Sequence, residues 1–433
     1  MFKKVTSLFE AHAFTVLAFS VFGMLFVMRP MTWLPTLIIL LCAVWMLFSA
    51  SARERLKIVM GGADFSLVVQ PLVIWFVVCL FIGLWHLGFA RKTFPDNALR
   101  MAMASFTIAL TVTALAGRAF FLGLLTASVF ATFAVLYGYW GAGAILPRIS
   151  GTTNHPIHFG NFAALLAVLL LSVALLARSC HKFFRAACFV GALLACGAAA
   201  ASQSRSAVGV LLCLLPLIVA AKTDRFHKWA IRLAAAVALV ALVVVATNPA
   251  VQERLRLKEA AVDMQQVEAN NYRTSIGARF AMWHAGWLMF KEHPLLGIGP
   301  GKYQADFGRR IELGEVPMGD VVHGQPHNDL LHSASSGGLL KLMAYLFLMA
   351  GPFVFFYKKY KANRHDLDKR VFPIMGMQVV AAFFITGLTN SNFDLQIYST
   401  MYAVLVCVLA RLSVFEINAA EPSTLSSPAA PNC

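Results

Sequence analysis

Residues 161–177 read NFAALLAVLLLSVALLA and are followed directly by Arg178. This run is almost entirely apolar and has nearly the length that one helix needs to cross a bilayer, about 20 residues. The whole chain shares this character: 59% of its 433 residues are apolar and 13% are charged. A soluble domain has roughly 45–50% apolar and about 25% charged residues. The composition excludes a disordered protein, a fibrous protein and a soluble enzyme, and indicates an all-α, polytopic membrane protein.

Twelve stretches of this kind each predict a membrane-spanning helix. They lie near residues 14–28, 32–50, 65–90, 101–116, 120–141, 161–177, 186–201, 207–221, 230–247, 338–356, 371–389 and 395–412. The predicted organisation is therefore nine spans in 1–247, a loop domain with helices at 248–337, three spans in 338–412, and a tail at 413–433. The tail is rich in Ser, Pro and Ala, which predicts disorder.

The distribution of charge predicts the orientation. The chain has 36 Lys and Arg against 20 Asp and Glu, a net charge of +16, and in a soluble protein this excess would suggest nucleic acid as a partner. Most of the basic residues fall in short segments on the side of Lys3 and Lys4, as the positive-inside rule requires of cytoplasmic loops. We therefore expect both termini in the cytoplasm, the loop domain outside, and no nucleic acid.

Polar clusters interrupt the apolar background at four places on the expected outer side, and such interruptions indicate function. The first is RISGTTNHPIH at 148–158, where Arg148 and the two histidines suit contact with an anion. The second is SQSRS at 202–206, a turn so short that Arg205 stays at the membrane surface. The planar guanidinium of arginine suits phosphate oxygens. The alternative for both clusters is an interfacial side chain without chemistry.

The third cluster is IGARFAMWHAGW at 276–287, where helical spacing puts Arg279 and Trp283 on one face. Its aromatic residues favour a helix packed against the membrane or the spans. The sequence PLLGIGPG at 294–301 follows. Its glycines are typical of nucleotide loops, but no strand precedes them and no βαβ unit follows, so helix termination is the favoured interpretation.

The fourth cluster is HGQPHNDLLH at 323–332. Its three histidines suggest a metal site, but Gly324 and Pro326 interrupt the helix that would align them. The second interpretation is a histidine general base, since the unperturbed pKa of histidine lies near neutral pH, with Asn328 or Asp329 fixing the ring. The third interpretation is a polar loop without chemistry.

Together the clusters place two or three arginines and a histidine beside a bilayer. Arginines suit a lipid diphosphate, which is a good leaving group once its charge is neutralised. A histidine suits deprotonation of an attacking hydroxyl. The sequence therefore predicts transfer of a group from a lipid-diphosphate carrier to an alcohol without a metal or other cofactor. None of the eight cysteines falls in a segment assigned to the outer side, so no disulfide is expected.

In this order, the four clusters resemble the O-antigen ligase/polymerase superfamily of bacterial membrane glycosyltransferases, as do the dozen spans and the large loop between two late spans. The residues that carry the resemblance are Arg148, Gly151, His155 and Pro156; Ser202, Ser204 and Arg205; Arg279 and Trp283 with Pro294 to Gly299; and His327, Asn328 and Gly337.

The resemblance implies a GT-C-like fold in the bacterial inner membrane, a periplasmic active site and an undecaprenyl-diphosphate-linked glycan as donor. In the ligases the acceptor is a sugar hydroxyl of lipid A–core, and transfer inverts the anomeric carbon without a metal. The implied catalytic residues are His327 as general base and Arg205 and Arg279 on the diphosphate. The implied substrate-binding residues are Arg148, His155, Asn328, Trp283 and Ser204.

Other functions share parts of this pattern. An O-antigen polymerase and an O-linked oligosaccharyltransferase use the same donor, and the pair His327–Asn328 beside the tenth span favours the ligase. A lipid-linked glycan transporter would carry ionisable groups near the midplane, often in repeated halves with broken helices. The predicted spans carry almost no charge, so a transporter is the less favoured hypothesis.

Overall fold

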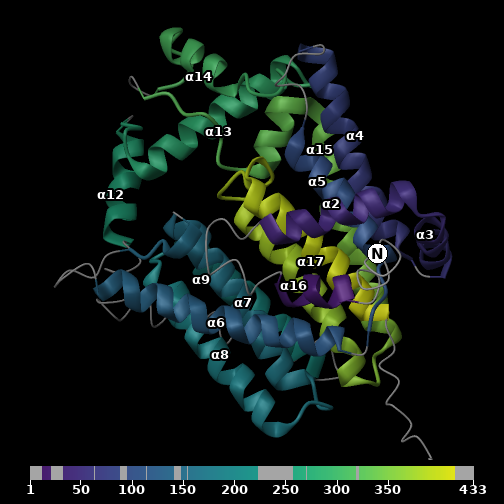
Figure 1. The fold of residues 1–433 in the computed structure, drawn as a ribbon. Coiled ribbons are helices and arrows are strands. Elements are labelled where there is room, and N and C mark those ends of the chain that lie inside the picture. The colour runs from purple at the N-terminus through teal and green to yellow at the C-terminus, as the bar shows by residue number, and fades with distance from the viewer. Residues whose placement is uncertain are drawn as a thin grey trace, which may run out of the picture.

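The computed structural model describes residues 12–20, 33–62, 64–87, 95–113, 115–140, 148–153, 155–222, 257–269, 271–317 and 321–414 (Figure 1). Every regular element within these ranges is a helix, and they contain no strand. The all-α fold class predicted from the sequence is confirmed.

Seven described helices are long and apolar enough to cross a membrane. They are α4 (Ser66–Leu87), α6 (Ala116–Trp140), α7 (Pro156–Leu176), α8 (Lys182–Ala201), α15 (Asp329–Ala362), α16 (Leu367–Gly387) and α17 (Gln396–Val414). The pair α2 (Trp33–Phe48) and α3 (Ala50–Gly62) is bent by 105° at Ser49, whose side chain caps α3 by accepting the N–H of Ala52. The protein is therefore a multi-pass membrane protein. The predicted span 230–247 and much of 14–28 lie outside the described residues.

Helix α7 lies at the centre of its part of the bundle. Of its most apolar stretch, 89% of the residues are buried inside the protein, against 33% in α4 and in α8. Helix α7 contacts α6, α8, α16 and α9 (Arg205–Lys222). Gly160 brings α7 against the turn at 202–206, because a Cβ there would lie 2.2 Å from the Ser202 Oγ. The most deeply buried of the seven candidate spans thus forms the core around which the site is built.

One predicted span is not a continuous helix. In place of 101–116 the structure has α5 (Asp96–Ala104), the short 3-10 helix η3 (Ser105–Ala109) and an extended residue at Leu110. The hydroxyls of Ser105 and Thr107 donate to backbone carbonyls three residues earlier. Such local side-chain bonds compete with the regular helix, and this competition ends α5 before it reaches the length of a span.

The loop domain contributes α12 (Leu257–Glu268), α13 (Ser275–Glu292) and α14 (Tyr303–Glu312), which lie together at the upper left of Figure 1. Helices α13 and α14 share a small hydrophobic cluster that includes Ala285, Met289 and Phe307. The buried Arg310 of α14 links the two helices. It donates to Asp306 in α14, to Glu315 just after α14, and to Glu292 at the end of α13.

The tenth predicted span begins earlier than expected, at Asp329, and is broken at Gly338. Gly338 has φ +62° and ψ −158°, a conformation essentially restricted to glycine. The loop 294–299 lies in this break: Ile298 N–H donates to the Ser335 carbonyl at 2.9 Å, and Leu339 N–H donates to the Pro294 carbonyl at 2.7 Å. Gly297 and Gly338 therefore permit two backbones to touch, which holds the first segment of α15 (residues 329–337) in place.

Candidate active site

The turn between α8 and α9 is the first part of the site. Arg148 Nε donates to the Ser202 carbonyl at 3.5 Å, and Ile149 N–H donates to the Ala201 carbonyl at 3.2 Å. The first polar cluster is thereby joined to the second. Ser204 is buried, whereas Arg205, the first residue of α9, is exposed. The turn thus presents a guanidinium group at the end of the membrane-embedded bundle.

A buried chain of polar side chains supports this turn. The Ser204 and Ser206 hydroxyls are 2.9 Å apart, and Ser206 Oγ donates to Asn161 Oδ1 at 2.6 Å. Asn161 Nδ2 donates in turn to the Tyr398 hydroxyl at 3.3 Å, which lies 3.1 Å from Nδ1 of His158. Ser204 therefore packs within a network that links α7, α9 and α17, and contact of Ser204 with substrate stays a prediction.

His155, within the first cluster, caps α7. Its Nδ1 accepts the N–H of Ile157 at 3.3 Å, and its ring lies 4.8 Å from the ring of His158. Burial lowers the pKa of His155, and the charge of Arg148 lowers it further. At neutral pH His155 is therefore an uncharged ring held beside an arginine.

Helix α13 holds the loop 323–328 in position. The Trp283 indole N–H donates to the Pro326 carbonyl at 3.0 Å, and Arg279 lies one helical turn before Trp283. His327, next to Pro326, has φ +49°, which is uncommon for a residue other than glycine. This strained conformation directly beside a hydrogen-bonded anchor marks His327 as a positioned side chain. Trp283 thus orients the loop 323–328, and contact of Trp283 with substrate stays a prediction.

The surroundings of His327 keep its ring neutral. Burial is the largest influence and lowers the pKa of His327. A hydrogen bond with the Asn390 side chain raises it, and the charge of Arg279 lowers it, as His323 and His155 do in their protonated forms. Asn390 is itself fixed, because its Nδ2 donates to Asn392 Oδ1 at 3.0 Å. A neutral histidine with an oriented ring has a nitrogen lone pair that can accept a proton.

The expected partners of His327 are replaced by Asn390. Asn328 caps α15, where its Oδ1 accepts the Leu331 N–H at 3.1 Å and its Nδ2 donates to the Leu388 carbonyl at 3.2 Å. Asp329 accepts the N–H of Phe393 at 3.4 Å. The expectation that Asn328 or Asp329 fixes the ring is therefore wrong, because both side chains serve the backbone around the start of α15.

The two arginines of the site act on each other. Burial lowers the pKa of Arg279, and the nearby charge of Arg205 lowers it further. Arginine nevertheless stays protonated in proteins, so Arg279 experiences the like charge of Arg205 and itself acts on the neutral His327. Binding of a dianion between them would relieve this repulsion. In the described ranges, no group of three or more His, Cys, Asp or Glu side chains is arranged to hold a metal ion.

The structure thus gathers side chains from all four predicted clusters into one region. Asn390, Asn161 and Tyr398 belong to the same region and were not predicted. The run TNSN at 389–392 carried the same signal as the four clusters, since it interrupts apolar sequence between two spans. Asn161 and Tyr398 lie within or beside apolar helices, and only the packing of α7 against α17 reveals them.

Residues 190–346 match the O-antigen ligase family. This ligase-family region includes Arg205, Arg279 and His327, whereas Arg148 and His155 precede it. An uncharacterized protein of Haemophilus influenzae is 25% identical to the chain over 262 residues. That alignment covers 58% of this chain and 64% of the relative, which is less than two thirds of its length. The family match supports the predicted superfamily and a ligase- or polymerase-type glycosyltransferase.

Proposed function

We propose that the protein is an O-antigen ligase that transfers a glycan from undecaprenyl diphosphate to a sugar hydroxyl of lipid A–core on the periplasmic face of the inner membrane. The proposal rests on one observation: within the ligase-family region, Arg279 experiences the like charge of Arg205 and itself acts on a neutral, hydrogen-bonded histidine, His327. These are the groups needed to bind a diphosphate and to deprotonate an alcohol.

The proposed reaction is a direct displacement. His327 takes the proton of the acceptor hydroxyl while that oxygen bonds to the anomeric carbon of the glycan. The bond from this carbon to the diphosphate oxygen breaks on the opposite side, so the configuration inverts. Undecaprenyl diphosphate leaves with the bonding electrons, and Arg205 and Arg279 stabilise its added charge. The diphosphate supplies the activation, and no metal or other cofactor takes part.

A lipid-linked donor is supported by an apolar pocket between α6 and α8. The pocket has a volume of about 420 Å³, is lined by residues such as Val135, Leu194 and Gly197, and reaches Gln203. Gln203 lies two residues before Arg205, so a hydrocarbon chain in this pocket would leave its diphosphate at the arginine turn. We propose that the first isoprene units of the carrier bind here.

The test compares His327→Ala, Arg205→Ala and Arg279→Ala in liposomes supplied with purified donor and lipid A–core. Each variant should lose transfer by roughly a hundredfold or more, since removal of one charge-stabilising group costs about 3 kcal/mol of barrier. Arg309→Ala, a change at an exposed arginine on α14, should retain activity. Full activity of His327→Ala would refute the general-base assignment, and loss of wild-type activity on chelation would refute metal independence.

The same assay separates the ligase from its alternatives. Attachment of the glycan to lipid A–core identifies a ligase, and lengthening of the donor in the absence of lipid A–core identifies a polymerase. Transfer to a protein acceptor identifies an oligosaccharyltransferase. A transporter would release no undecaprenyl diphosphate under any of these conditions.

A further inference from the structure

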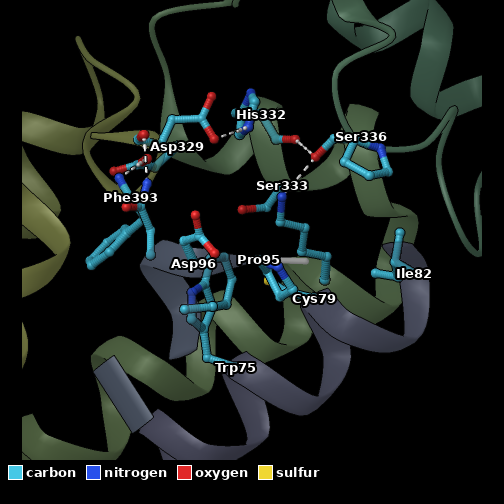
Figure 2. Close-up of a pocket in the computed structure, with 15 residues that line it drawn as sticks. Trp75, Cys79, Ile82, Pro95, Asp96, Asp329, His332, Ser333, Ser336 and Phe393 are labelled. Atoms are coloured by element: carbon cyan, nitrogen blue, oxygen red, sulfur yellow. Dashed lines mark hydrogen bonds and ion pairs between the residues drawn. The ribbon is translucent and has the colours of Figure 1, made fainter. Parts of the chain in front are cut away.

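A second polar pocket lies on the other side of the first segment of α15, residues 329–337. Figure 2 shows it between α4, α5, α15 and the 3-10 helix η5 (Asn392–Asp394), with Asp96 and Trp75 facing His332 and Ser333 across the opening. Its volume is about 330 Å³, at the lower end of the range for ligand pockets, roughly 300–1,000 Å³. This is room for a small ring system, not for a long glycan.

The groups that line the pocket include both hydrogen-bond donors and acceptors. His332 Nε2 lies 3.2 Å from Asp394 Oδ1, and Lys341 Nζ donates to Ser336 Oγ at 3.0 Å. The same ammonium group lies 5.6 Å from the centre of the Trp75 ring, so an aromatic wall adjoins the polar groups. Fixed donors and acceptors beside an aromatic surface are suited to a hydroxylated ring with apolar C–H faces.

The pocket carries carboxyl groups where the arginine site carries guanidinium groups. Asp96 and Asp394 line it together with the ammonium group of Lys341. Asp394 is paired with His332, and the buried Asp329 accepts the Phe393 N–H. The pocket therefore lacks the surplus positive charge by which Arg205 and Arg279 would attract a diphosphate. The two sites on either side of the segment 329–337 therefore select different chemistry.

We propose that this acidic pocket binds an uncharged sugar ring of one of the two substrates, most directly the acceptor sugar. The inference rests on the proposed transferase function for the identity of the substrates, but not for the chemistry of the ligand. Asn328, next to His327, caps the segment whose next turns carry His332 and Ser333. With a rise of about 1.5 Å per residue, the capping residue and Ser333 are separated by roughly 7.5 Å along the helix. A bound ring would thus lie near the proposed base.

The experiment alters Asp96, which is exposed at the first turn of α5 and whose change spares the core. Asp96→Asn removes the negative charge and replaces one acceptor oxygen by a donor, and Asp96→Arg reverses the charge. Asp64→Asn, the same change at an exposed residue before α4, is the control. Transfer is measured with each substrate varied in turn. Thermal shifts in detergent are measured with two probes, a neutral core oligosaccharide without lipid and inorganic diphosphate.

We expect both Asp96 variants to raise KM for the acceptor roughly tenfold or more, with kcat little changed, and to lose the thermal shift caused by the oligosaccharide. The shift caused by diphosphate should persist in them and vanish in Arg205→Ala. A raised KM for the donor instead of the acceptor would assign the pocket to a sugar of the donor glycan.

The proposal is overturned if both Asp96 variants behave as Asp64→Asn does in KM and in thermal shift, or if they lose the response to diphosphate instead of the response to sugar. Failure of the proposed function gives a different result. In that case the wild type transfers no glycan, while an oligosaccharide shift that depends on Asp96 still supports the sugar pocket.

Discussion

Asn390 is the residue on which the proposed chemistry of His327 depends most directly. It holds the histidine ring through a side-chain hydrogen bond and is itself held by Asn392, whose Nδ2 donates to Thr386 Oγ1 at 2.9 Å. This chain leads from the core of α16 to the loop at 323–328. We regard Asn390 as a positioning residue, since it acts through His327.

We predict that Asn390→Ala lowers kcat by about tenfold, because the ring of His327 loses its orientation and one hydrogen bond is worth roughly 1–1.5 kcal/mol. The same hydrogen bond raises the pKa of His327, so the acid limb of the pH–rate profile should move to lower pH in the variant. KM for the donor should not change. Asn363→Ala, at the opposite end of α15, is the control, and an unmoved acid limb would contradict the assignment.

The pH dependence of the wild type follows from the lowered pKa of His327. Protonated histidine cannot accept the proton of the acceptor, so transfer should fall as the pH drops through the folded-state pKa. Because burial and Arg279 lower the pKa below the usual 6.5, the acid limb of kcat/KM should lie below pH 6.5. Arg279→Gln removes a charge that lowers the pKa, and its residual activity should show this limb at higher pH.

At the residue scale, the sequence indicated side chains but not their partners. His327, Arg205 and Arg279 stood out because charge is rare in an apolar chain. The orienting residue was assigned to the neighbours in sequence, Asn328 and Asp329, whereas it comes from Asn390 across the fold. A hydrogen bond between residues 63 positions apart depends on packing, which local sequence does not encode.

At the scale of elements, the break in α15 decides where the site lies. The sequence predicts its two segments separately, the first as a polar cluster and the second as a span that starts at residue 338. The helix does break at Gly338. The role of PLLGIG was not predicted, since a contact between two backbones leaves no mark other than its glycines. The prediction of a span at 101–116 was wrong for a related reason. Hydropathy takes no account of the hydrogen bonds from the Ser105 and Thr107 hydroxyls to the backbone, which end α5.

We predict that Gly338→Ala destabilises the protein by about 3 kcal/mol or more. Alanine is strained at φ +62° and ψ −158°, and its Cβ would lie 2.2 Å from the carbonyl carbon of Leu295. Thermal unfolding in detergent measures the loss. Gly61→Ala, where a Cβ meets nothing within 4 Å, should change the stability by no more than about 1 kcal/mol. Equal melting temperatures for both variants would show that the break is not required.

At the scale of the whole molecule, the sequence was sufficient to predict a helical membrane protein, because apolar stretches of about 20 residues have the length of a membrane-spanning helix. The number of spans and the sidedness are separate matters. Seven described helices qualify as spans, with an eighth if the bent pair α2–α3 is one. The sidedness rests on the distribution of Lys and Arg and stays a prediction.

Labelling from outside intact spheroplasts tests this orientation. Glu312→Cys, at the exposed end of α14, should react with a membrane-impermeant maleimide, because α14 belongs to the loop domain that we expect outside. Lys361→Cys, at the far end of α15, should react only after the membrane is permeabilised. The reverse pattern would invert the predicted topology and place the site in the cytoplasm.

The first segment of α15 is short, stiff and fixed at both ends, by the Asn328 cap and by the backbone contacts of the loop 294–299 at the break. His327 adjoins one end of it, and His332 and Ser333 project from its body. A displacement of this segment therefore moves the wall of the acidic pocket and the proposed base together. We therefore expect a ligand bound on one side of the segment to change the binding free energy of a ligand on the other side. The two substrates should then bind with a measurable coupling free energy instead of independently.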